Sequence, residues 1–543
     1  MKVLSRGLFL LGLAVALVTT AGVVLNYSPV PYWDQWIGNV DWYMKANQSW
    51  WPAFWSLHNE HRLLFSRLIF YPDMRWFGGV NVLSFISNVV MCGLMALSLW
   101  RAAIFRSGMT AEAKLATAGI ILAFCFSWMQ RDNFTWAFQN QWFAVGMFAI
   151  LAFHALALSA AGGYSKRWFA AGIFAALTSA FSMANGSLAW PVFILLMAYY
   201  RFPLRYFAVA IVVALMEVFF YFHHADGAMG TLQHGTPGWV LRHDPVGLVR
   251  YAVAYLGSPI YHPFHRFKLA TLAGLLVVVG TATGFVCACK NRDMKVMPLL
   301  ATAIFMCITA LATGIGRLTL GLESVFEPRY ATNGLLAWAS ILLFWAVNLK
   351  RETMRPLVYG GIGVGLLSVL VVQPAAFTGN PDVLYGRLVA GQAMRDDIFD
   401  RQYMQALWFA GPNGDAIKPI VLQAQKESIS ILRPNATGYD TPPDHIDSTK
   451  TCPGAYDSTK PTETPGWQRA EGWTYADHGR ARTVAITDAS GKTVGSGVVG
   501  GYRPDAAAAV GTRNKRLGWV AFYRDTPNIH VFAKTGTGYC MIR

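Results

Sequence analysis

The feature that most constrains this chain is a recurring apolar run of the length that crosses a bilayer. A transmembrane helix needs about 20 predominantly apolar residues, and such runs recur from residue 7 to residue 376. We expect about eleven spans, at 7–25, 80–100, 115–129, 143–161, 168–184, 187–200, 206–222, 268–289, 297–315, 331–349 and 357–376. Only 14% of the residues are charged, against about 25% in soluble proteins. The sequence therefore predicts a mostly α-helical, polytopic membrane protein.

The positions of the basic residues predict the orientation of the chain. The formal net charge is +16, but Lys and Arg gather in short connections between apolar runs, as in cytoplasmic loops. This pattern argues against a nucleic-acid partner. With about eleven spans, the basic connections all fall on the side of Lys2 and Arg6. We therefore expect a cytoplasmic N-terminus and an extracytoplasmic C-terminus.

Three substantial pieces then lie outside. A transmembrane module at 1–376 carries the first outer loop at 27–79. The second piece, 223–266, includes an expected interfacial or re-entrant helix at 248–256. After residue 376 we expect a helical segment at 377–435 and a β-sandwich at 436–543. The sandwich follows from alternating apolar runs separated by turn-forming residues.

Two of the seven cysteines, Cys452 and Cys540, bracket the predicted sandwich. Disulfides form in oxidising compartments outside the cytoplasm. If this domain is extracytoplasmic, a Cys452–Cys540 disulfide is expected. The other cysteines lie in or beside apolar runs, where Cys behaves as a small apolar residue.

The first outer loop combines carboxylates with tryptophans. Asp34 lies between Trp33 and Trp36, a few residues beyond the first span, and Asp41 follows in the same loop. An aromatic belt at the membrane surface explains the tryptophans alone but needs no carboxylates among them. We therefore interpret Asp34 as a candidate general base and Asp41 as its reserve.

Four further candidates follow in His58, Glu60, His61 and Arg62. The apolar positions from 58 to 70 fit a helix lying on the membrane surface. A divalent metal is one interpretation, because His is a common ligand. However, the two histidines are three positions apart rather than the four of the zinc-protease signature, and no third ligand is evident. Substrate or phosphate binding is the favoured interpretation.

The later outer connections add candidates for phosphate and sugar binding. Arg329 and Tyr330 open a late span after Glu327, and Arg317 ends the span before. A guanidinium at the membrane boundary can grip a lipid-linked phosphate, although an Arg there can also simply snorkel to water. Gln139 belongs to an outer loop of amides and aromatics that could bind sugars, or cap helices and anchor them at the interface.

Two polar residues inside the apolar runs are also notable. Glu217 is an isolated acid within an expected span, and such acids are functional by default. No partner for it can be named from the sequence. Asn185, before Gly186, is expected to turn the chain between two spans.

Together these features resemble the GT-C superfamily of polytopic membrane glycosyltransferases. The resemblance covers roughly the first 375 residues and rests on the architecture, the acidic loop Trp33–Trp36 and the Arg329–Tyr330 pair. The stretches 58–62 and 182–186 also resemble bacterial members of that group. The C-terminal sandwich is similar to extracytoplasmic domains appended to some members.

The resemblance implies an enzyme of a bacterial inner membrane. It would transfer a hexosyl or pentosyl group, with inversion, from a polyprenyl-phosphate-linked donor to an extracytoplasmic glycan, lipid or protein. Asp34 would deprotonate the acceptor, and Arg329 would stabilise the departing phosphate. The alternatives are a lipid-linked glycan transporter or flippase, a polysaccharide polymerase, and a glycan-binding surface protein.

Overall fold

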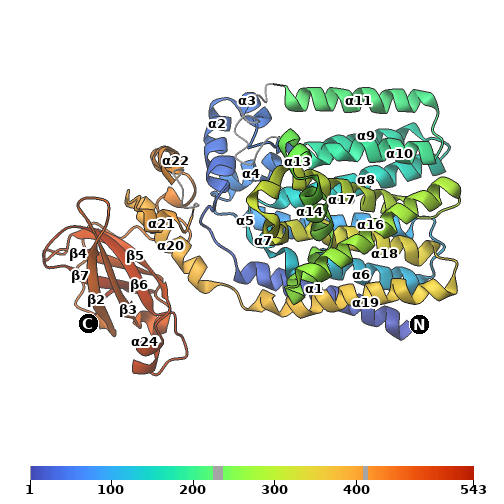
Figure 1. Ribbon diagram of the computed structural model, residues 1–543. Coiled ribbons are helices and arrows are strands. Elements are labelled where there is room, and N and C mark those ends of the chain that lie inside the picture. The colour runs from blue at the N-terminus through green and yellow to red at the C-terminus, as the bar shows by residue number, and fades with distance from the viewer. Residues whose placement is uncertain (1, 224–236, 408–413, 543) are drawn as a thin grey trace. The chain divides into compact units, whose positions relative to one another are not determined.

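Helices account for most of the chain in the computed structural model, which describes residues 2–223, 237–407 and 414–542. Within those ranges, nine helical segments are long and apolar enough to cross a membrane. They are built on α1 (Lys2–Leu25), α5 (Val82–Ile104), α6 (Ala111–Cys125), α8 (Asn140–Ala161), α11 (Leu204–Phe222), α16 (Phe267–Lys290), α17 (Met297–Arg317), α18 (Ala331–Asn348) and α19 (Arg355–Val372). Figure 1 shows these helices side by side with roughly parallel axes. The expectation of a multi-pass, mostly helical membrane protein is confirmed at this level.

The remaining two expected spans are helices, but they are short. α9 (Lys166–Ala180) has 15 residues and α10 (Ala189–Tyr199) has 11. The 3-10 turn η3 (Ala184–Leu188) separates them. Gly186 lies directly against the main chain of Ser179, so the turn folds tightly onto the end of α9. Each helix is shorter than the roughly 20 residues of a membrane-crossing helix, which is why nine segments rather than about eleven meet the length criterion.

Short elements connect the long helices at the end where α17 finishes. They are η2 (Trp128–Gln130), α7 (Arg131–Thr135), α13 (Pro237–His243), α14 (Pro245–Leu256), α15 (Ser258–Phe264), η4 (Leu318–Leu320), η5 (Leu322–Phe326), η6 (Pro328–Tyr330) and η8 (Gln373–Phe377). The helix expected at 248–256 is present and forms the larger, C-terminal part of α14. Residues 224–236 of the same outer piece lie outside the described residues.

A close contact between two glycines sets the packing of α1. Gly12 lies against the main chain of Gly119 on α6, and Gly119 lies against that of Leu8. A side chain at either position would separate the two backbones. Small residues at helix contacts allow this close packing in membranes, so α1 belongs to the helical bundle itself.

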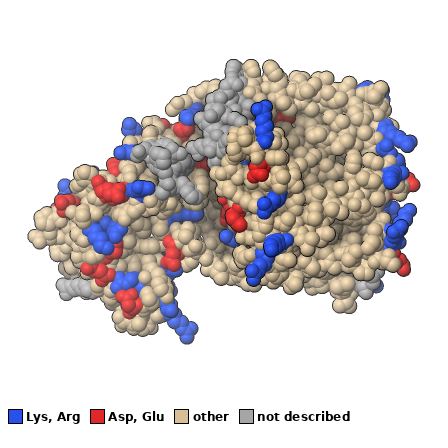
Figure 2. Space-filling view, in the orientation of Figure 1, with Lys and Arg blue, Asp and Glu red and all other residues tan. Residues whose placement is uncertain are grey.

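The connections that carry most of the basic residues lie together at one end. The Arg106 guanidinium donates to the carbonyl of Ala161 at 3.4 Å, which joins the connection after α5 to the end of α8. Arg292 donates to the carbonyls of Ala198 and Tyr199 at 3.1 and 2.8 Å, which joins the connection after α16 to the end of α10. Figure 2 shows Lys and Arg concentrated at this end, where α1 begins, while the surface along the helices carries little charge.

The described chain divides into two compact units. The helical unit comprises Met1–Leu25, Phe54–Ile69 and Ser84–Gly379, and the mixed unit comprises Asn26–Ala53, Phe70–Leu83 and Asn380–Arg543. The first outer loop, expected as one piece at 27–79, therefore contributes to both units. Its elements are η1 (Trp36–Asp41), α2 (Trp42–Gln48), α3 (Trp50–Trp55) and α4 (Leu64–Trp76).

The C-terminal part of the mixed unit begins with helices and continues as a β-sheet domain. The helices are α20 (Pro381–Arg395), α21 (Arg401–Met404), α22 (Gly414–Lys426) and the turn η9 (Ser430–Leu432). The strands are β1 (Thr451–Cys452), β2 (Gly454–Pro461), β3 (Trp467–Thr474), β4 (Thr483–Thr487), β5 (Thr493–Gly501), β6 (Gly518–Arg524), β7 (His530–Thr535) and β8 (Gly538–Ile542), with α23 (Ala476–Gly479) and α24 (Pro504–Ala509) between them.

The eight described strands form one continuous sheet, in the order β1-β8-β7-β4-β5-β6-β3-β2. Only β1 and β8 pair in parallel. The edge strands β1 and β2 are consecutive in the chain, and Gly454 of β2 lies against Ile542 of β8, so the sheet curls back on itself. The sequence pattern predicted the β-sheet domain, but not that its strands share one sheet instead of the two layers of a sandwich. Register shifts such as that at Tyr456–Ser458 help the sheet to bend.

One apolar core lies inside the curled sheet, and it contains both cysteines expected to pair. Cys452 and Cys540 are bonded to each other. They are buried beside Trp519 and Ala533 in the same cluster. The predicted disulfide is confirmed, and the five other cysteines are free thiols.

Candidate functional site

A four-residue hairpin presents the first group of candidate side chains. The main-chain groups of His58 and His61 exchange two hydrogen bonds, of 2.8 and 2.9 Å, and Asn59 adopts a φ of 51° at the turn. Asn tolerates this left-handed conformation better than most residues. The surface helix expected from residue 58 is therefore wrong for its first residues, since α4 begins only at Leu64.

Glu60, at the tip of this hairpin, pairs with the arginine that ends α17. Its Oε1 lies 3.1 Å from Nη2 of Arg317. Burial raises the pKa of the Glu60 carboxyl, but His61 and Arg317 lower it more, so the net shift is downward. The side chains of Glu60 and Arg317 remain 29% and 28% exposed, which leaves both within reach of a ligand. The hairpin and the end of α17 thus place an ionised carboxylate and a guanidinium side by side.

His61 connects this ion pair to the turn η3. Its Nδ1 accepts a hydrogen bond from the main-chain N–H of Ala184 at 3.3 Å, and its Nε2 lies 3.6 Å from the Glu60 carboxylate. A nitrogen that accepts carries no proton, so this arrangement places the proton of the neutral ring on Nε2, facing Glu60. His61 and the α17 arginine therefore both lie beside Oε1 of Glu60. Its neighbour His58 packs on the Phe138 ring, 4.9 Å between centroids.

The same turn reaches the isolated acid of α11. Ser187 donates to Oε1 of Glu217 at 3.0 Å, and Glu217 is only 3% exposed. Its Oε2 and the Oδ1 of Asn185 are buried without a hydrogen-bond partner among the described residues. Asn185 does lie in a turn, as expected. The turn η3 also makes polar contacts with His61 of the hairpin and Glu217 of α11. The sequence could not reveal these contacts.

The Arg62 side chain binds main-chain carbonyls and does not face an open site. Its guanidinium donates to the main-chain carbonyls of Tyr221 and His223 at 2.7 and 2.8 Å and also to that of Trp55. The residue is only 3% exposed. Arg62 therefore caps the carbonyl end of α11, a contact that its expected role in substrate binding did not include. Arg67 likewise donates to carbonyls of residues 54 and 56.

A second group lies at the start of α18. Arg329 forms an ion pair with Glu327, and its main-chain carbonyl accepts from Asn133 at 2.8 Å. Tyr330 is buried between two aromatic rings, with centroid distances of 5.5 Å to Trp142 and 5.6 Å to Tyr255. The arginine is therefore held by its main chain while 22% of its side chain is exposed.

Several buried amides lie at residues 130–141, in the segment that contacts the second group. Asn133 also donates to the hydroxyl of Thr332 at 2.8 Å, and that hydroxyl donates to Gln130. Both polar atoms of the Asn140 side chain are buried without a partner among the described residues, as are the Oε1 atoms of Gln139 and Gln141. Unpaired buried amides are rare because each costs desolvation energy. Of these residues, the sequence singled out only Gln139 as a candidate for sugar binding. The amide-rich run 130–142 was the sequence feature that pointed to the others.

The two acids of the first outer loop belong to the mixed unit. Trp33 has a φ of 50°, an unusual conformation for a bulky residue. Asp34 follows directly, and its main-chain carbonyl accepts from Gly38 at 2.6 Å. Asp41 forms an ion pair with Lys45, 2.6 Å between Oδ2 and Nζ. Asp41 thus has a cationic partner beside it on the same helical stretch.

The structure brings Glu60, His61 and Arg317 together, and separately Glu327 and Arg329, all within the helical unit. Among the described residues, no group of three or more His, Cys, Asp and Glu side chains is arranged to hold a metal ion. No protein-family model matches the chain, and no curated protein matches its sequence.

Proposed function

We propose that this chain is a membrane glycosyltransferase of the GT-C type. It moves a sugar from a polyprenyl-phosphate-linked donor to an extracytoplasmic glycan, lipid or protein. In this proposal the chain lies in a bacterial inner membrane, with the basic end of the helical unit in the cytoplasm and the mixed unit in the periplasm.

The observation that carries the proposal is the pairing of charge at the end of the helical unit opposite its basic connections. Arg317 and Arg329 each lie beside a carboxylate there. α17 runs from the basic end to Arg317, so this arginine lies at the far end of the helix. A lipid-linked phosphate entering from the membrane would meet cations at this boundary, and charge-assisted bonds from Arg are the strong form of phosphate recognition.

The buried amides and aromatic rings nearby supply the other half of a sugar-phosphate site. Sugars offer hydroxyls that need donors and acceptors, and apolar ring faces that stack on aromatic side chains. Asn140 has two buried amide atoms without partners among the described residues, and Trp142 lies two positions away against Tyr330. A sugar hydroxyl would satisfy these atoms, which otherwise cost desolvation energy.

The proposed reaction is an inverting displacement at the anomeric carbon. The Asp34 carboxylate takes the proton of the acceptor hydroxyl, whose oxygen forms the new bond to that carbon. The bond from the anomeric carbon to the phosphate oxygen breaks, and its electron pair leaves with the polyprenyl phosphate. Arg329 and Arg317 balance the charge that develops on the phosphate. The strained Trp33 beside Asp34 supports this choice, because such conformations cluster at active sites.

Replacing the arginine beside Tyr330 tests the phosphate role. Purified Arg329→Gln should release free polyprenyl phosphate from a lipid-linked sugar about 100-fold more slowly than wild type, the loss typical of removing one anion-stabilising donor. Arg131→Gln is the matched control, because Arg131 lies on α7 at the same end and is 52% exposed. Equal rates for Arg329→Gln and wild type would remove Arg329 from the mechanism.

A lipid-linked glycan transporter is the second candidate, and one observation favours it. The interrupted pair α9 and α10 carries a turn that holds the buried acid Glu217 through Ser187, and transporters place broken helices and buried acids on their pathways. A transporter would move the lipid-linked glycan across a vesicle membrane without releasing polyprenyl phosphate. In that case Glu217→Gln, and not Arg329→Gln, would abolish the measured activity.

A further inference from the structure

A second feature lies away from the groups described above, in an apolar groove at the basic end of the helical unit. The groove lies between α10 and α16, and both helices pack on α17, which forms its floor. Its volume is about 140 Å³. Engineered cavities of about 150 Å³ bind a benzene-sized apolar group, so the groove has room for a short length of one hydrocarbon chain.

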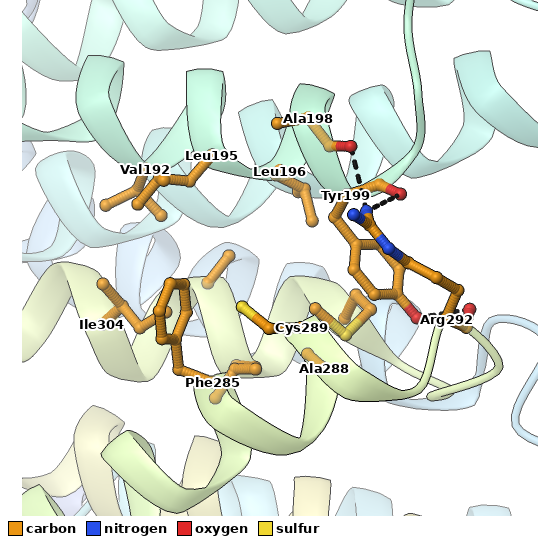
Figure 3. A pocket seen from close by; sticks show the side chains of 13 residues that line it. Val192, Leu195, Leu196, Ala198, Tyr199, Phe285, Ala288, Cys289, Arg292 and Ile304 are labelled. Carbon is orange, nitrogen blue, oxygen red and sulfur yellow. Dashed lines mark hydrogen bonds between the residues drawn. The ribbon is translucent and has the colours of Figure 1, made fainter.

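The walls of the groove are apolar and open to the outside of the bundle. Leu195 on α10 is 46% exposed and Phe285 on α16 is 41% exposed. On the floor, Leu300, Ala301 and Ile304 follow the spacing of one helix face. Figure 3 shows Leu195, Phe285 and Ile304 around the same space. A lipid-facing surface of this kind accepts an acyl chain and excludes water.

A fixed cation closes one end of the groove. Arg292 Nη1 donates to the carbonyls of Ala198 and Tyr199, and the Tyr199 hydroxyl donates back to the Arg292 carbonyl at 2.6 Å. Figure 3 shows this arginine beside the Tyr199 ring. The arginine is exposed, and its Nε and Nη2 have no hydrogen-bond partner among the described residues. These two nitrogens therefore remain able to donate to an anionic group at this end of the groove.

The surroundings of the mouth are also positive. Lys290 and Lys295 flank Arg292 in the same connection, against one acid, Asp293. The helix α17 begins at Met297 in the groove, and the N-terminus of a helix carries partial positive charge. An apolar channel that ends in an oriented cation is complementary to a molecule with a hydrocarbon chain and an anionic head.

We propose that this groove binds one acyl chain of an anionic phospholipid from the leaflet that meets the basic end, with Arg292 bound to the headgroup phosphate. Basic sites between helices bind such headgroups in other membrane proteins. This site is separate from the proposed sugar-transfer site. The bound lipid would hold the α10–α16 side of the bundle against the anionic leaflet. The exposed thiol of Cys289 lies in the groove and would be covered by the bound chain.

The test uses the full chain in nanodiscs of phosphatidylcholine, with or without phosphatidylglycerol. Native mass spectrometry measures the lipid that stays bound to the protein after its release from the nanodisc. An apolar maleimide measures the reactivity of Cys289. Arg292→Gln removes the headgroup contact, and Leu195→Trp fills the groove. The matched controls are Arg351→Gln, an exposed basic residue at the same end, and Val286→Trp, 49% exposed on α16 outside the groove lining.

Wild type should retain phosphatidylglycerol in preference to phosphatidylcholine, and this lipid should slow the labelling of Cys289. Arg292→Gln should reduce the preference about tenfold, the loss of roughly one charge-assisted hydrogen bond. Leu195→Trp should lose the retained lipid, and both controls should behave as wild type. Equal retention of the two lipids by wild type would overturn the proposal. Unchanged retention of phosphatidylglycerol by both Arg292→Gln and Leu195→Trp would also overturn it. A dimer without bound lipid in which Cys289 is protected from the maleimide would overturn it as well.

Discussion

At the scale of single residues, the environment of each carboxyl decides what it can do. Glu60 is ion-paired and its pKa is lowered, so it is ionised at neutral pH. Asp41 is held by Lys45. Asp396, just after α20, is different, because burial raises its pKa to about 7 against the opposing effects of Gln392 and Arg395. Its Oδ2 accepts from Gln392, which also donates to Ser496 of β5.

The raised pKa of Asp396 predicts a stability that depends on pH. The folded carboxyl has a pKa of about 7, against 3.8 for the ordinary group, so folding favours the protonated form. The cost of ionising it in the folded state is absent below pH 3.8, grows as the pH rises, and is complete above about pH 7. Asp396→Asn, a neutral mimic, should raise the melting temperature at pH 8 and leave it unchanged at pH 4.

The control is Asp397→Asn, the exposed neighbour in sequence. Melting temperatures of both variants and wild type, followed by the fluorescence of the purified chain across that pH range, provide the comparison. If Asp396→Asn and wild type melt at the same temperature at pH 8, ionisation of the Asp396 carboxyl does not destabilise the folded protein, and the prediction is wrong.

At the scale of elements, the sequence predicted helices and strands well and their contacts poorly. Apolar runs located the long helices because each run is a local property of the chain. The pair His61 and Ala184, 123 positions apart, and the pair Ser187 and Glu217, 30 apart, depend on how helices pack. No periodicity encodes such contacts. The curled sheet was missed for the same reason, since alternation shows which side chains point inward but not how many sheets share the strands.

The disulfide should contribute much of the stability of the β-sheet domain. It joins residues 88 positions apart, and closing a loop of that size in the unfolded chain is worth about 4.6 kcal/mol. The double variant Cys452→Ser with Cys540→Ser should make this domain melt at a lower temperature and more sensitive to protease. The pair Cys287→Ser with Cys289→Ser, both free thiols, is the control. Equal protease resistance in the two double variants would contradict the expectation.

At the scale of the whole molecule, the distribution of charge predicts its orientation. The basic connections share one end of the helical unit, and the disulfide belongs to an oxidising compartment. Both facts agree with a basic end in the cytoplasm and a mixed unit outside.

Site-directed labelling tests that orientation. In a Cys289→Ala background, a membrane-impermeant maleimide should label Ser490→Cys, in a turn of the sheet domain, on intact spheroplasts. It should label Glu352→Cys, whose parent side chain is 87% exposed between α18 and α19, only after the membrane is permeabilised. The reverse pattern would place the sheet domain in the cytoplasm, and the proposed donor site with it.

The central claim is that the chain transfers sugar with a base in its first outer loop, and one measurement tests it most directly. Purified wild type and Asp34→Asn are assayed for free polyprenyl phosphate released from a panel of lipid-linked sugars, with Asp41→Asn as the ion-paired control. We predict turnover by wild type and by the control, and a loss of about 100-fold or more in folded Asp34→Asn. Release at the wild-type rate by Asp34→Asn, or none by wild type with any donor, would contradict the claim.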